Sequence, residues 1–263
     1  MQSKSITLLQ RTMTIKLFPV VITLILAFVA QASAATHAKL CNVVLRPGIQ
    51  KYRVEFEKKF GPIRCLLSDS DFAFIEEGRG TIGLASAAHF RDEVFVTHEL
   101  LHLWLGAKGW DVTDHQKVFH VPALPQLGGQ LFINETTLNL EDYIEHRIIT
   151  PIMQNNGIKQ HKEREETVSK NEILNPRKGY NLASTGADYL ITNLDAPEVG
   201  KEYKQFLISK HWDAALEAAS IFDQIIESRN PRNQQAAFET VQACVDKVFS
   251  PGSKFLLAHR PGS

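Results

Sequence analysis

Cysteine is scarce in this chain, which has 3 cysteines among 263 residues. Cys41, Cys65 and Cys244 lie too far apart for the closely spaced pairs of a cysteine zinc site. Cys41 and Cys65 each adjoin a predicted strand. We therefore expect them to form a disulfide if the chain enters an oxidising compartment, leaving Cys244 as a buried thiol on a helix.

An excess of one charge is also lacking, because 29 basic residues balance 29 acidic ones. No basic block stands out in the sequence. Nucleic acid and anionic membranes are therefore not expected as partners. No internal repeat is found either, so nothing indicates a repeat architecture.

A long apolar run occupies residues 17–30, after three basic residues and before Ala32-Ser33-Ala34. This order matches an export signal with a small-residue cleavage site. The run is short for a membrane span and has no charged stop after it. We expect residues 1–34 to be removed and the protein to be periplasmic or secreted, with no stable membrane insertion. An uncleaved anchor is the alternative, and Met13 is an alternative start.

The segment His98-Glu99-Leu100-Leu101-His102 is an HExxH motif. On a helix, this spacing puts both imidazoles on one face, one turn apart. Two neutral imidazoles so placed can bind one Zn²⁺, and Glu99 can act as a general base on a water molecule that the metal activates. The alternative is a pair of core histidines bonded to backbone carbonyls.

The sequence around the motif supports a helix. Asp92 is the expected N-cap, and Gly106 is the expected stop. The residues at helical spacing between them form one apolar stripe: Val94, Phe95, His98, Leu101, His102 and Leu105. Both histidines should therefore face a core.

A catalytic zinc ion needs a third protein ligand, and the metzincin extension HExxHxxGxxH is absent. The helix expected over 140–152 offers Glu141 and Glu145, which fall within its apolar face. Burying carboxylates there is costly unless a cation such as zinc compensates. The alternative is a partly exposed helix edge that pairs with Arg147 or Lys159.

These motifs resemble the zincin metallopeptidases of the gluzincin type, over roughly residues 41–158. In thermolysin-like members a ligand glutamate is followed four residues later by a carboxylate, which Glu141 and Glu145 match. Glu145-His146 also resembles small uncharacterised bacterial HELLH proteins, in which the glutamate before the histidine is the ligand. The resemblance implies Glu145 as the third ligand and Glu141 as its support or substitute. Glu135, in an Asn-Glu pair, ranks third.

The expected fold class is α+β, with a small zincin-like sheet packed on the HExxH helix and a second ligand helix. Strands are predicted at 43–45, 63–67, 72–75 and 81–86, and a helix is predicted at 49–60. The strand at 81–86 is a candidate edge strand for an extended peptide. An ordinary strand within the sheet is the alternative.

A long connection is expected at 107–137. Its histidines, His115 and His120, could be hydrogen-bond donors to a transition state, extra metal ligands or simply solvated side chains. Residues 159–178 are charged and form the expected linker or helix after a metal-binding domain at 35–158. The part at 179–263 is predicted to be helical, in the same domain or beside it. Its predicted helices are 180–193, 197–209, 213–228 and 232–249.

The expected function is an exported zinc-dependent hydrolase, and specifically a metallopeptidase that acts on a peptide or protein. His98, His102 and Glu145 or Glu141 would hold the metal, and Glu99 would be the general base. One alternative is a zinc amidase acting on non-protein or cell-wall substrates. Another is a secreted binding protein whose HExxH is inert. The sequence does not fix the oligomeric state.

Overall fold

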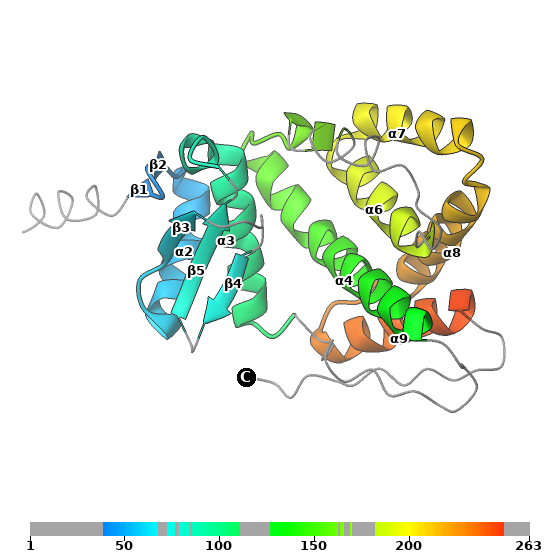
Figure 1. Cartoon of the computed structure of the whole chain (residues 1–263). Helices are drawn as coiled ribbons and strands as arrows, with labels where there is room; N and C mark the ends of the chain where they lie inside the picture. Colours follow the sequence, from blue (N-terminus) through cyan, green and yellow to red (C-terminus); the bar gives the residue numbers. More distant parts are fainter. Residues whose placement is uncertain are drawn as a thin grey trace, which may run out of the picture.

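The structure is a computed structural model that describes residues 39–67, 73–76, 79–84, 86–110, 127–162, 164–165, 169 and 182–249. The expected export signal, His115 and His120 lie outside the described residues. The described part is mostly helical with a small amount of strand, which confirms the α+β class in general terms. Figure 1 shows the strands at one side, the C-terminal helices at the other, and a long helix, α4 (Leu127–Asn155), between them.

The larger sheet has the strand order β3-β5-β4. Strand β5 (Arg79–Leu84) pairs in parallel with β3 (Arg64–Leu67) and antiparallel with β4 (Ala73–Glu76). The prediction that 81–86 is a free edge strand is therefore wrong, because β5 has a neighbour on both sides. Residues 80–84 are all buried, as expected of a central strand that is covered on both faces.

A disulfide joins the smaller sheet to the larger one. Strands β1 (Lys39–Leu40) and β2 (Val43–Val44) form a hairpin whose turn residues, Cys41 and Asn42, both have positive φ. Cys41 is bonded to Cys65 in β3, with a Cα–Cα distance of 5.5 Å. The predicted pairing is confirmed, and Cys244 is a buried free thiol, also as predicted.

The HExxH motif lies on α3 (Glu93–Ala107), which follows the short 3-10 helix η1 (His89–Arg91). The Asp92 side chain accepts a hydrogen bond of 3.0 Å from the Val94 amide, which confirms the predicted N-cap. The helix continues one residue past Gly106. It is buried on most sides and not along a single stripe, because it packs against α2 (Pro47–Phe60), the sheet and α4.

Helix α4 (Leu127–Asn155) is 29 residues long. The prediction of a connection as far as residue 137 is therefore wrong, and Glu135 lies exposed inside the helix. Gly128 and Gly129 disfavour a helix locally, and packing of a long helix against its neighbours outweighs such propensities. Arg147 donates a 2.6 Å hydrogen bond to Glu227 of α8 (Asp213–Arg229), so its charge is directed away from the buried glutamates.

The described residues from 182 onward form helices close to their predicted ranges: α6 (Leu182–Asp195), α7 (Pro197–Ser209), α8 (Asp213–Arg229) and α9 (Gln234–Phe249). Leu140 and Ile144 of α4 belong to a core with α6, α8 and α9. Ile149 and Met153 of the same helix belong to a core with α2, α3 and β5. Helix α4 therefore connects the two halves of the molecule, because its side chains pack into both hydrophobic cores.

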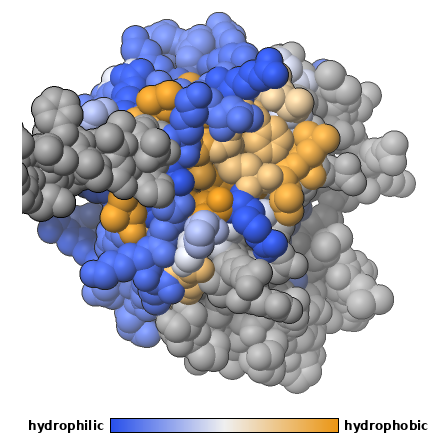
Figure 2. Space-filling view, turned by 90° about the vertical axis from the view of Figure 1, so that its left-hand side faces the viewer, coloured by the Kyte–Doolittle hydropathy of each residue, from blue (hydrophilic) through white to orange (hydrophobic). Residues whose placement is uncertain are grey.

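Figure 2 views the molecule from the side of β1, β2 and α2, where apolar residues gather among hydrophilic ones. Exposed large apolar side chains in this half include Val44, Val54, Leu66 and Leu67. Within the described part of the chain, no helix has both the length and the apolar character required to cross a bilayer.

The disulfide makes a prediction about stability. Cys41→Ser should lower the free energy of unfolding by about 3 kcal/mol. The bridge closes the loop between residues 41 and 65, which lowers the entropy of the unfolded chain. Denaturant titration followed by circular dichroism measures the change. Cys65→Ser and the double variant should show the same loss as the single variant. If the variants unfolded at the same denaturant concentration as the wild type, the prediction would be contradicted.

Candidate metal centre

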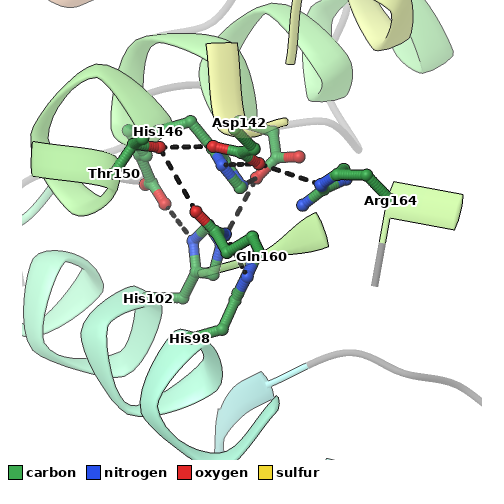
Figure 3. Close-up of polar contacts among 9 residues, drawn as sticks. His98, His102, Asp142, His146, Thr150, Gln160 and Arg164 are labelled. Atoms are coloured by element: carbon green, nitrogen blue, oxygen red, sulfur yellow. Dashed lines mark hydrogen bonds and ion pairs between the residues drawn. The ribbon is translucent and has the colours of Figure 1, made fainter. Parts of the chain in front are cut away.

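Three histidines converge between α3 and α4. His98 and His102 come from the HExxH motif, and His146 comes from α4. Each offers one ring nitrogen, and the nitrogens lie within 4.8 Å of one another. Figure 3 shows the two α3 imidazoles directed toward the side chains of α4. The group is positioned to bind a metal ion.

Two of the imidazoles have a carboxylate at their outer nitrogen. Nδ1 of His102 lies 2.6 Å from Oε2 of Glu145, and Nδ1 of His146 lies 2.8 Å from Oδ2 of Asp195. A carboxylate accepts hydrogen bonds, so Glu145 places the proton of His102 on Nδ1 and leaves its Nε2 for a metal. His146 has a second carboxylate, Asp142, 3.3 Å from its Nε2, so a metal ion there would displace a proton. This arrangement of metal, histidine and carboxylate is common around protein metal ions.

His98 has an amide, Gln160, at its outer nitrogen. The Gln160 NH₂ lies 2.9 Å from Nδ1 of His98, so the amide donates and Nδ1 accepts. The Gln160 oxygen lies 3.5 Å from the Thr150 hydroxyl, which also contacts Asp195. A neutral His98 therefore carries its proton on Nε2, the nitrogen that faces His102.

The inner nitrogens of His98 and His102 are only 2.7 Å apart. His98 Nε2–H donates to the lone pair of His102 Nε2, whose own proton is on Nδ1 beside Glu145. A metal ion bound by both Nε2 atoms would displace the proton that they share. The outer partners thus hold two potential ligand atoms at the centre of the cluster.

Buried carboxylates favour positive charge in and around the histidine cluster. Burial raises the pKa of Asp195, but His146 and Arg164 outweigh this effect and lower it to about 2, so Asp195 is ionised. Burial lowers the pKa of His146, but Asp195 and Asp142 raise it to about 10. Arg164 lies 2.8 Å from Asp195 and supplies a permanent positive charge. A metal ion would replace the proton of His146 as the second compensating charge.

The residues predicted from the sequence divide into three groups. His98 and His102 are in the cluster, as expected. Glu145 is next to it, at the outer nitrogen of His102, and it also forms a second possible metal group with His102 and Asp142. Glu99 and Glu141 are both buried, with 7% of each residue exposed. Among the described residues, neither belongs to a group of converging metal-ligand atoms.

Four residues of the site were not predicted from the sequence: Asp142, His146, Gln160 and Asp195. His146 had a usable signal, because it directly follows Glu145 on a helix that was already a ligand candidate. Asp142 is four residues before His146, so helical spacing places it on the same face. Gln160 and Asp195 gave no local signal, since only the packing of α6 and the segment after α4 brings them to the histidines.

The contact between Asp195 and His146 makes a prediction about metal affinity. Asp195→Asn should weaken metal binding roughly 10- to 100-fold, the usual effect of removing such an outer partner. The amide keeps the shape of the side chain but loses the charge that orients the imidazole. Competition with a chromophoric chelator measures the affinity.

Asp223→Asn is the matched control, because Asp223 also bonds α4, through a 2.8 Å hydrogen bond from Tyr143. It should leave the metal affinity unchanged. Equal affinities of wild type, Asp195→Asn and Asp223→Asn would show that Asp195 does not orient a ligand.

Comparison with known proteins gave no match to any protein family, curated protein or solved structure.

Proposed function

We propose that this protein is an exported zinc-dependent hydrolase and, more narrowly, a metallopeptidase. The observation that carries the proposal is the convergence of three imidazole nitrogens, from His98, His102 and His146, within 4.8 Å of one another. Three protein ligands with a fourth position for water or substrate are the common pattern of catalytic zinc sites. Imidazole ligands suit zinc, although they also suit copper, iron and nickel.

We place His146, and not Glu145, in the third position. Glu145 lies at Nδ1 of His102, the nitrogen that points away from His98. His146 shares the inner cluster, with its ring centroid 4.8 Å from that of His98 and 5.2 Å from that of His102. Glu145 in this account orients His102, and the earlier expectation that it binds the metal stays a competing prediction.

Glu99 is the proposed general base. It directly follows His98 on α3 and is buried, as the HExxH motif requires of its glutamate. A bound zinc ion would polarise the scissile carbonyl and lower the pKa of a water molecule. Glu99 would accept the proton of that water and pass it to the leaving amine.

The proposed substrate is a peptide or protein outside the cytoplasm, and a crosslinked wall peptide belongs to the same class. The disulfide between Cys41 and Cys65 supports an oxidising compartment. The HExxH helix beside a small sheet supports the resemblance to zincins. Glu141, buried one turn before Glu145, stays a candidate for supporting the ligand helix.

Replacement of Glu99 tests the catalytic part of the proposal. Glu99→Gln should lower the rate of peptide hydrolysis by roughly 10²- to 10⁴-fold, because the amide cannot accept the proton. Metal content should stay at the wild-type value. Cleavage of a peptide library by the zinc-loaded protein, read by mass spectrometry, measures the rate.

Glu202→Gln is the control for this experiment, since Glu202 is an exposed glutamate on α7. It should cleave at the wild-type rate. Undiminished cleavage by Glu99→Gln would remove Glu99 from the mechanism. A wild-type protein that binds zinc and cleaves no peptide would remove the peptidase assignment.

A further inference from the structure

A carboxylate faces the inner nitrogens of two of the three histidines. Oδ1 of Asp142 lies 3.5 Å from Nε2 of His102 and 3.3 Å from Nε2 of His146. Asp142 is one helical turn before His146 on α4, so both side chains leave the same face of the helix. In Figure 3, Asp142 lies beside His146, across from the imidazoles of α3.

These distances are those of neighbouring ligands around one metal ion. Zinc–ligand bonds of about 2.0 Å in a tetrahedron place the ligand atoms about 3.3 Å apart. Asp142 matches this separation with respect to both His102 and His146. An ion bound by the Nε2 atoms of these two rings would lie within bonding reach of Oδ1.

Asp142 also differs from the histidines in its exposure. Its side chain is 39% exposed, whereas that of His146 is fully buried. The carboxylate therefore stands on the solvent side of the cluster, where water or a substrate would enter. Its partial exposure also lets water solvate the charge if the side chain rotates away.

We infer that Asp142 is a fourth protein ligand, which closes the metal site at rest and must leave before water or substrate binds. This inference rests on the proposed metal site of His98, His102 and His146. Opening is a ligand exchange, in which one bond from the metal to a carboxylate oxygen breaks and one bond to the incoming oxygen forms. Asp142 thus regulates access to the fourth position.

A different explanation of the same contact is an ion pair between Asp142 and protonated His146. The two explanations differ once a metal is bound. A metal ion displaces the proton from His146, so an ion pair would be lost, whereas a ligand carboxylate would stay and exclude other anions.

The test uses the full chain loaded with Co²⁺, whose visible spectrum reports the number and kind of ligands, and azide as a small anion. Wild-type protein should keep its spectrum as azide is added. Asp142→Ala should bind Co²⁺ at least tenfold more weakly and respond to azide at a concentration at least tenfold lower. Asp142→Asn, which retains the shape of the side chain, provides the same readouts if the alanine variant does not fold.

Asp223→Ala is the control, because Asp223 bonds Tyr143 of the same helix and does not touch the cluster. It should behave as wild type. Equal azide response and equal Co²⁺ affinity in wild type and the Asp142 variants would overturn the inference. A different result would show that the three-histidine site itself is wrong. In that case the wild type would bind no Co²⁺, or His98→Ala would bind it equally well.

Discussion

The contact between the inner nitrogens of His98 and His102, 2.7 Å apart, is the constraint on which the rest of the site depends. One of these nitrogens donates its N–H to the other, and a bound metal ion would replace that proton. The rings cannot turn out of this contact without losing Glu145 and Gln160 at their outer nitrogens. The protein thus uses hydrogen bonds outside the cluster to direct metal-binding atoms into it.

The outer partners connect the helical C-terminal part to the histidine cluster. Asp195 ends α6 and is completely buried between His146 and Arg164. Helix α4 carries His146 and packs into both hydrophobic cores. Loss of packing between α4 and α6 would therefore disturb a proposed metal ligand directly. The two halves of the chain depend on each other through α4.

The sequence predicted what is encoded locally. Helical periodicity gave the C-terminal helices to within a few residues, the N-cap at Asp92 was correct, and the cysteines were paired correctly. It failed where distant segments decide the outcome. The strand at 81–86 is central because β3 and β4 both pair with it. Asp195 and Gln160 reach the histidines only through tertiary packing, so no spacing rule could identify them.

The identity of the third ligand is the most direct test of the account. Metal content by elemental analysis should be about one ion per chain in the wild type and in Glu145→Gln, which keeps a hydrogen-bond acceptor for His102. It should fall to background in His98→Ala and His146→Ala, with circular dichroism confirming that each variant is folded. A metal ion retained by folded His146→Ala and lost from folded Glu145→Gln would contradict the account and establish Glu145 as the ligand.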